Sequence, residues 1–171
     1  RVVVWDFHPP WTGVRAMLRD GANPYSEEVT QTIQMEMLGR RARSGEDQYA
    51  FAYPLHLMVV IGPLALVPLP AAQAVWFSLL VLGLVTFIVA APRAVGWRPS
   101  GWLKSLTALF AVGLYSTVWA LVLGQLAIIV AAFVALTWWN LRAGRWKIAG
   151  VCLALATVKP QISFLFVPGV L

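Results

Sequence analysis

The fold is decided by the uncharged stretch QYAFAYPLHLMVVIGPLALVPLPAAQAVWFSLLVLGLVTFIVAAP, which occupies residues 48–92. A second stretch, residues 105–141, also lacks charged side chains. A membrane-spanning helix needs about 20 residues. At about 1.5 Å per residue, the second stretch would form a helix about 55 Å long, against a hydrocarbon core of about 30 Å. We therefore expect each stretch to fold back on itself.

The composition of the whole chain agrees with a membrane protein. Its 171 residues are 60% hydrophobic and 12% charged, whereas an average soluble domain is roughly 45–50% apolar and about 25% charged. So few charges cannot cover the surface of a soluble globule of this size. The composition excludes a soluble globular domain, a disordered chain and a disulfide-stapled secreted module. It predicts an all-α, polytopic transmembrane helical bundle.

The charged residues are unevenly distributed. All seven acids lie within residues 1–47 together with six arginines, whereas residues 48–171 hold seven bases and no acid. Six of these bases form two clusters, which are Arg93, Arg98 and Lys104 and then Arg142, Arg145 and Lys147. Basic clusters between apolar stretches are typical of cytoplasmic loops. A nucleic-acid binder would instead need a basic patch on a soluble surface, so no nucleic-acid partner is predicted.

Proline, glycine and weak turn signals divide the apolar part, residues 54–171, into about five membrane helices. The predicted helices lie near residues 54–68, 71–91, 104–117, 121–139 and from 148 to the end. If both basic loops are cytoplasmic and residues 1–53 lie outside, the segment 54–70 has to be re-entrant or stop short of crossing. The alternative places one basic cluster outside, and both topologies stay open. Since the sequence starts with Arg1 and stops inside an apolar stretch, we expect a piece of a longer protein.

The first 53 residues differ from the rest and are expected to form an extracytoplasmic loop. Apolar spacing predicts two short amphipathic helices at residues 13–20 and 27–43, with Ser26 as the N-cap of the second. Their modest apolar faces favour helices that lie along the membrane surface. A small soluble appendage packed on the rest of the protein is the alternative.

Carboxylate chemistry is confined to residues 1–47 because all acids lie there. Asp6 follows the apolar run Val2–Trp5, which resembles the tail of a spanning helix, and it lies beside His8. Its carboxylate would then sit at the membrane surface, where lipid headgroups lie. We consider Asp6 a candidate general base, with an interfacial helix cap as the alternative. The remaining acids fit helix ends or solvated faces.

Lys159 is the one base that stands alone inside an apolar run. A lysine near the middle of a spanning helix costs roughly 2.5–3.5 kcal/mol unless it faces a polar cavity. Pro160 opens the backbone beside it. A cation in such a cavity suits an anionic group such as phosphate, and snorkelling to the nearer interface is the alternative. Gln125, after Gly124, fits a broken helix that lines a cavity or an interhelical hydrogen bond.

The sequence contains no G-x-S-x-G, H-E-x-x-H, Walker or dinucleotide motif and no cysteine–histidine pattern spaced for a metal. Accordingly, no metal and no cofactor is predicted. The lone cysteine, Cys152, is expected to be a small buried hydrophobe. If sugar chemistry occurs here, the donor must be reached from the membrane.

Four segments together resemble glycosyltransferase family 87 of the GT-C superfamily. They are DFHPPWTGVRAMLRDGANPY (6–25), YPLHLMVVIGPLALVPLP (53–70), LGQLAIIVAAFVAL (123–136) and RAGRWKIAGVCLALATVKPQ (142–161). The resemblance implies a multi-pass enzyme of the plasma (inner) membrane. Its donor would be a polyprenyl-phosphate-linked hexose, expected to be mannose, and its acceptor a glycolipid or glycan hydroxyl. It also implies a catalytic aspartate in the first extracytoplasmic loop, which corresponds to Asp6.

The hypothesis that follows is an inverting transfer, with Asp6 as general base and Lys159 near the donor phosphate. The residues expected to line the substrate cavity are His8, Asn23, Tyr25, Tyr53, His56, Gln125 and Gln161. Broken helices and an intramembrane lysine are also features of transporters. A transporter or flippase, or a non-catalytic membrane subunit, therefore stays as the alternative function.

Overall fold

A computed structural model describes residues 4–164 of the chain. Every regular element within that range is a helix, and the range contains no strand. This confirms the all-α expectation for the described part. The chain divides into two compact units, Arg1–Phe77 and Ser78–Leu171, with the boundary inside one long helix.

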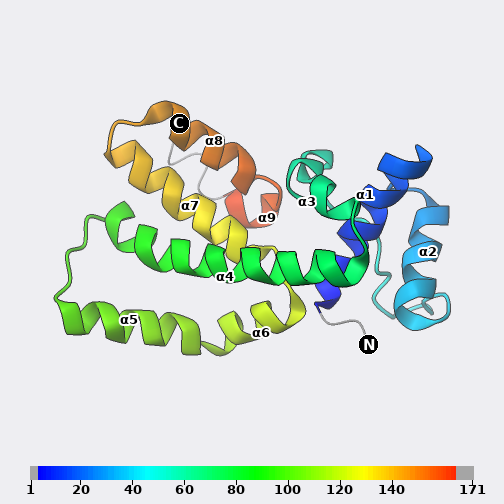
Figure 1. Cartoon of the computed structure of the whole chain (residues 1–171), viewed down its shortest axis with the longest axis horizontal. Helices are drawn as coiled ribbons and strands as arrows, with labels where there is room; N and C mark the ends of the chain where they lie inside the picture. The colour runs from blue at the N-terminus through cyan, green and yellow to red at the C-terminus, as the bar shows by residue number, and fades with distance from the viewer. Residues whose placement is uncertain (1–3, 165–171) are drawn as a thin grey trace. The chain divides into compact units, whose positions relative to one another are not determined.

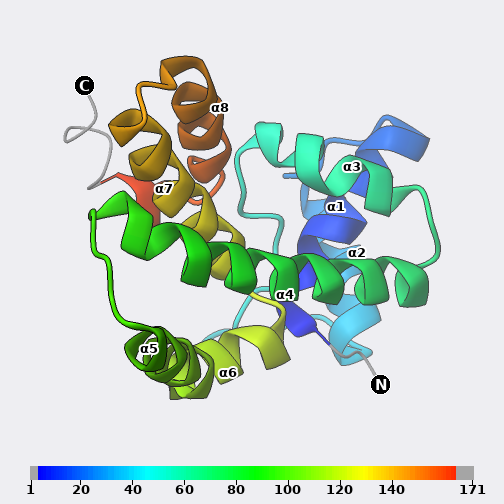
Figure 2. The ribbon, with the colours of Figure 1, turned by 60° about the vertical axis from the view of Figure 1, so that its left-hand side comes forward.

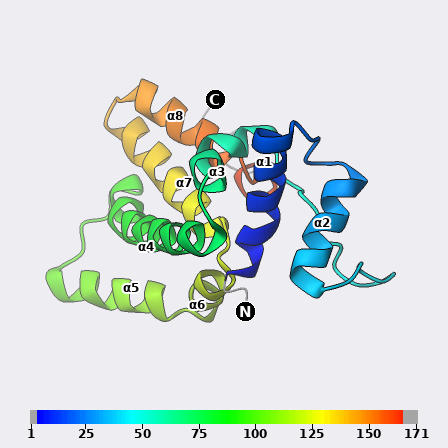
Figure 3. The same ribbon diagram turned by 45° about the vertical axis from the view of Figure 1, so that its right-hand side comes forward.

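The first unit is organised around one helix, α1. Its elements are the 3₁₀ turn η1 (Trp5–Phe7), α1 (His8–Asp20), α2 (Glu27–Leu38), the 3₁₀ turn η2 (Leu55–Leu57), α3 (Met58–Ala65) and the start of α4 (Leu69–Ala94). Figures 1 and 3 show α1 between α3 and α2, and it contacts both. The core includes the fully buried Phe7, Ile33 and Leu57, and Phe7 stacks on Trp76 at 5.0 Å between ring centroids.

Both amphipathic helices of this unit exist, but their bounds differ from those predicted. Prolines occupy the first turn of α1, where they are favoured, so the helix starts at His8 rather than at residue 13. Ser26 caps α2 as expected, since its Oγ accepts a hydrogen bond from Val29 N at 3.3 Å. The predicted end at residue 43 is wrong, because Gly39 adopts φ 69° and ends α2 at Leu38.

Side chains of α1 donate hydrogen bonds to the free carbonyls at the carboxyl end of α3. Trp11 Nε1 donates a buried hydrogen bond of 2.9 Å to the carbonyl of Leu64. Arg15 and Arg19 donate to the carbonyls of Ala65 and Leu66 at 2.9 and 3.3 Å. Cations are favourable there because the last carbonyls of a helix carry partial negative charge. The arginines of α1 thus serve as helix caps.

The predicted helix 54–68 is wrong in its bounds. α3 is preceded by the 3₁₀ turn η2 and covers only Met58–Ala65. Pro63 lies inside α3 and does not end it. The chain instead leaves the helix at Leu66 and enters α4 just after Pro68. The carbonyls freed at this end are those that α1 satisfies.

The second unit contains the rest of α4 and five further helices among its described residues. These are α5 (Gly101–Gly113), α6 (Tyr115–Leu123), α7 (Ala127–Arg142), α8 (Trp146–Ala156) and α9 (Pro160–Ser163). Figures 1 and 2 show α7 and α8 side by side as a hairpin. Ala135, Ala149 and Ala156 are buried, and such small residues let neighbouring helices approach closely. Cys152 is buried in α8, as predicted.

Two predicted breaks in this unit need correction. The bend falls at Leu114, and α5 and α6 meet there at 53°, so the predicted helix 104–117 is interrupted. The predicted helix 121–139 is also interrupted, because Gly124 (φ 75°) ends α6 before α7 begins. The last helix was expected to start near 148 and run to the end. It covers Trp146–Ala156, and residues 165–171 lie outside the described part.

Among the described residues, α4 is long and apolar enough to cross a membrane. It has 26 residues, and its most apolar window has a mean hydropathy of 2.5. The bent pair α5–α6 passes the same test when its two helices are taken together as one broken span. Length and composition thus support one span, or two with the bent pair. The five spans expected from the sequence stay a prediction.

Candidate functional site

Asp6 lies in the 3₁₀ turn η1 and is half-buried. The expected helical tail before it is wrong in its last residues, because Val4 adopts φ 73° and Trp5–Phe7 form a single 3₁₀ turn. Val2 and Val3 lie outside the described part. Positive φ is unusual for a β-branched residue, so the backbone is strained at Val4, two residues before Asp6.

Asp6, Tyr25 and Tyr53 belong to one neighbourhood. Burial and the nearby charge of Asp6 raise the pKa of the Tyr53 phenol. The hydroxyl of Tyr25 donates a hydrogen bond to the carbonyl of Tyr53. The ring of Phe51 lies edge-on to both tyrosine rings, at 5.1 and 6.2 Å between centroids. Three predicted site residues are therefore drawn together by the segment that follows α2.

His8 is buried at the start of α1 and is held by α2. Its Nε2 donates a hydrogen bond of 2.9 Å to Oε2 of Glu36, and Thr12 Oγ1 donates to the same oxygen at 2.9 Å. These bonds, led by the one from His8, hold the pKa of the Glu36 carboxyl below its usual value, although partial burial opposes the shift. Nδ1 of His8 is buried and has no hydrogen-bond partner in the described part.

Glu36 was expected at a helix end or on a solvated face. The sequence analysis did not predict that it accepts hydrogen bonds from His8 and Thr12. His8 and Thr12 are four residues apart and thus face the same side of α1. The short connection between α1 and α2 brings Glu36 opposite that side. A polar pair at this spacing on an otherwise apolar helix face is the signal that points to a partner on the next helix.

Asn23 and His56 are two exposed candidates of the first unit. Asn23 is exposed, and its Oδ1 accepts a hydrogen bond from the backbone N–H of Tyr25 at 3.0 Å. It therefore shapes the turn between α1 and α2. His56 is exposed in η2.

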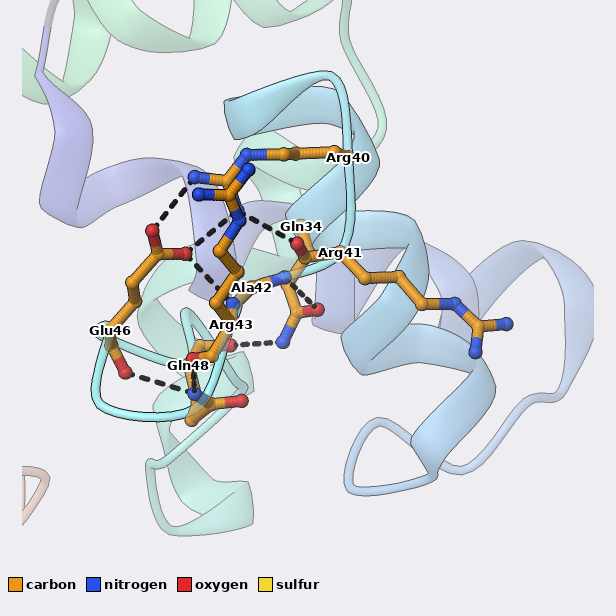
Figure 4. A network of polar contacts seen from close by, with 7 residues as sticks. All are labelled: Gln34, Arg40, Arg41, Ala42, Arg43, Glu46 and Gln48. Carbon is orange, nitrogen blue, oxygen red and sulfur yellow. Dashed lines mark hydrogen bonds and ion pairs between the residues drawn. The ribbon is translucent and has the colours of Figure 1, made fainter.

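The loop after α2 is fixed by its own polar network (Figure 4). Both guanidinium nitrogens of Arg40 donate to the Glu46 carboxylate at 2.8 Å. These bonds and the backbone N–H of Arg43 lower the pKa of Glu46 to about 2. The buried Gln34 donates to the carbonyl of Gln48 at 2.8 Å and accepts from Ala42 N at 2.9 Å. The Glu46 carboxylate therefore stabilises the conformation of this loop.

Lys159 lies at a helix junction rather than near the middle of a helix. It precedes α9 as its N-cap residue, with φ −126°, and its side chain is half-buried. The expected opening of the backbone at Pro160 is confirmed, because α8 ends at Ala156 and α9 starts at Pro160. Gln161 is exposed on α9. No Asp or Glu follows residue 47, so Lys159 has no carboxylate partner within its own unit.

Gln125 lines a cavity of about 320 Å³ within the second unit, together with Ser116 and Thr117. It follows Gly124, whose left-handed backbone ends α6, so the helix break expected beside Gln125 is confirmed, and its role in a substrate cavity stays a prediction. Asp6 and Lys159 belong to separate units, and a pocket shared by them stays a prediction. The described residues contain no group of three or more His, Cys, Asp or Glu side chains that could hold a metal ion.

Comparison with known protein families identifies a match for most of the chain. The model of glycosyltransferase family 87 matches residues 51–171 of the chain, which is more than half of its length. No curated protein and no solved structure matches. Tyr53, Gln125 and Lys159 lie inside the matched range, together with His56 and Gln161. The candidates that precede it are Asp6, His8, Asn23 and Tyr25.

Proposed function

This chain belongs to glycosyltransferase family 87, and from that premise we propose that it transfers a hexose, mannose by expectation, from a polyprenyl-phosphate-linked donor. The acceptor is a hydroxyl of a glycolipid or glycan. Family membership makes the protein a glycosyltransferase, and together with the apolar helix α4 it indicates a membrane protein. We further propose a multi-pass enzyme of the plasma (inner) membrane with about five spans in this part of the chain.

The family match is the observation that carries the proposal. A lipid-linked donor is supported by the long apolar helix and by a sequence without nucleotide-binding motifs. A donor dissolved in the bilayer needs a site that opens toward lipid, whereas a nucleotide sugar needs a soluble domain. The transporter and the non-catalytic subunit have no comparable support, because the matched family is one of transferases.

Asp6 is proposed as the general base. Its carboxylate would take the proton of the acceptor hydroxyl while the hydroxyl oxygen bonds to the anomeric carbon. The bond between that carbon and the phosphate oxygen breaks, and its electron pair leaves with the polyprenyl phosphate. One displacement from the face opposite the phosphate inverts the anomeric configuration. The half-burial of Asp6 and its position near Tyr53 support a protected site for this step.

Lys159 is proposed to bind the phosphate that leaves. The leaving group is already an anion, so it needs a cation rather than a proton donor. The lysine follows a helix break and has no carboxylate in its own unit to neutralise it, which leaves its charge for a ligand. His8, Tyr25 and Tyr53 would line the acceptor side, with Asn23 and His56 at its edge. Gln125 and Gln161 would line the donor side.

The test uses the full-length protein and a radiolabelled polyprenyl-phosphate mannose with a glycolipid acceptor. Asp6→Asn should lower the rate of transfer by about 10²–10⁴-fold, the usual contribution of a general base. Asp20→Asn removes an exposed carboxylate from the end of α1 and should keep the rate within a factor of two. Transfer at the wild-type rate by Asp6→Asn would remove Asp6 from this role.

A second measurement addresses the stereochemistry. The anomeric configuration of the product, read by NMR, should be opposite to that of the donor. Retention of configuration would exclude the single displacement and require a covalent intermediate.

A further inference from the structure

The two basic loops lie at the same end of the second unit. The guanidinium of Arg93 stacks over the ring of Trp139 at 5.1 Å. The guanidinium of Arg142 lies so close to Gly96 that a Cβ built there would be 2.6 Å from it. Figure 1 shows the connection between α4 and α5 and the connection between α7 and α8 on one side of this unit. Cations far apart in the sequence are therefore concentrated at one end.

A groove lies between the last turns of α4 and residues 104–111 of α5. Its volume is about 930 Å³. Arg93, Arg98 and Lys104 line the groove next to the connection between α4 and α5, and we call this end its mouth. Much of the remaining lining is apolar, for example Phe87, Ala108 and Ala111. The helices on either side expose further large hydrophobic side chains, among them Val89 and Phe110. The groove thus joins a cationic mouth to two apolar helix surfaces.

The charges at the mouth are not balanced from within the unit. Residues 48–171 contain no Asp or Glu, so neither Arg98 nor Lys104 can form an ion pair with a carboxylate side chain there. Lys104 lies in the first turn of α5, where the helix dipole adds further positive potential. A cationic mouth that no internal anion neutralises is complementary to an anionic ligand.

We propose that this groove binds a phospholipid with an acidic headgroup. The phosphate lies between Arg98 and Lys104, and the acyl chains lie along the apolar walls formed by α4 and α5. Basic pockets between membrane helices are known to select acidic lipids by this combination of charge and apolar surface. The groove is separate from the proposed donor site. The basic residues 142–147, which lie at the same end of the unit as the groove, are at the start of α8, whereas Lys159 follows the other end of α8.

The experiment measures lipid binding to the full-length protein in a non-ionic detergent. Radiolabelled phosphatidylglycerol is bound and then competed with unlabelled phosphatidylglycerol or phosphatidylcholine. The double variant Arg98→Gln with Lys104→Gln should weaken phosphatidylglycerol binding by at least about fivefold, the effect of losing one cation near a headgroup, and by about thirtyfold if both cations contribute fully. Arg145→Gln with Lys147→Gln is the matched control, since it removes the same charge from the start of α8, where neither residue lines the groove. Binding by this control should stay within twofold of the wild type.

A conservative variant and a chemical label separate binding from folding. Arg98→Lys with Lys104→Arg should retain binding, because both cations are kept. A phosphatidylglycerol with a photoreactive acyl chain should label the segment 87–111 of the wild-type protein. The proposal is overturned if phosphatidylcholine competes equally well, if the control pair weakens binding as much as the groove pair, or if the label reacts elsewhere. The last result is also the one expected if another segment of the full-length protein fills the groove.

Discussion

Nε2 of His8 and Oε2 of Glu36 lie 2.9 Å apart, although 28 residues separate them in the sequence. The pair joins the start of α1 to the middle of α2, and Thr12 donates to the same carboxylate oxygen at 2.9 Å. His8 is buried, whereas the side chain of Glu36 is 43% exposed. The buried imidazole of His8 is therefore held in place by a carboxylate that is itself partly exposed to solvent.

The first prediction concerns Glu36→Gln. The pKa of Glu36 is lowered in the folded protein, so its carboxylate stabilises the fold at pH values above its unfolded pKa. This contribution is lost as the pH falls through the lowered folded value. The variant should be less stable than the wild type by about 0.5–1 kcal/mol near neutral pH, because the pair is partly exposed. The difference should vanish in acid, and thermal unfolding from pH 7 to pH 3 measures it.

Glu28→Gln provides the control for this series, because it removes the same charge from α2 at a distance from His8. Its difference from the wild type should not follow the same pH course. An identical course for both variants would mean that net charge, rather than the contact with His8, sets the effect.

The second prediction is that Gly13→Ala destabilises the first unit. An added Cβ would lie 2.6 Å from Cδ2 and 2.9 Å from Cγ of Phe51. Overpacking of this kind costs about 1–3 kcal/mol, partly offset by a gain of about 1 kcal/mol in helix propensity. The thermal midpoint of the full-length protein should fall. Phe51→Leu introduced in addition should recover part of the loss.

Gly62→Ala serves as the comparison, since its added methyl would lie 4.0 Å from Leu18 Cδ1, an ordinary contact. It should be neutral or slightly stabilising. If the two alanine variants have the same thermal midpoint, the close packing of Phe51 on α1 is not what Gly13 provides.

The third prediction is that Trp11→Phe weakens the junction of α1 with α3. The ring is largely kept, but the Leu64 carbonyl loses its buried donor. Leaving a buried polar group unpaired costs about 1–3 kcal/mol. Trp102→Phe, at a side chain that is 69% exposed, should change the unfolding free energy by much less. Equal effects would argue against the hydrogen bond as the cause.

The fourth prediction is that Arg40→Gln raises the pKa of Glu46. The value of about 2 rests first on the hydrogen bonds from Arg40 and then on the Arg43 backbone N–H, which the variant keeps. The pKa should therefore return only partway toward 4.5. Carboxyl ¹³C chemical shifts of labelled glutamate, followed from pH 2 to pH 6, measure it. Arg41→Gln is the control, because Arg41 donates to Gln31 and not to Glu46. An unchanged pKa in Arg40→Gln would contradict the assignment.

The sequence predicted elements whose cause is local. Ser26 starts α2 through its own side chain, and Pro160 interrupts the helix beside Lys159. It also identified the family through the order of four segments, and the match over residues 51–171 confirms that resemblance.

Other positions could not be derived from local patterns. Pro63 is tolerated inside α3, and the carbonyls at the end of α3 find donors on α1 about 50 residues earlier in the chain. The pair α5–α6 bends at Leu114, directly after Gly113, whereas the prediction placed the break after residue 117. Nothing in the local sequence distinguishes Glu36 from the other acids of α2. Its contacts with His8 and Thr12 exist only because α2 packs against α1.

The sequence by itself thus determined that the chain is helical, where its charges lie and which family it belongs to, because composition and capping act within a few residues. Only the tertiary structure decided that His8 meets Glu36, that Tyr53 lies near Asp6, and that two basic loops gather at one end of the second unit. These pairings depend on how helices pack. Packing is set by side-chain contacts between segments that no local pattern connects.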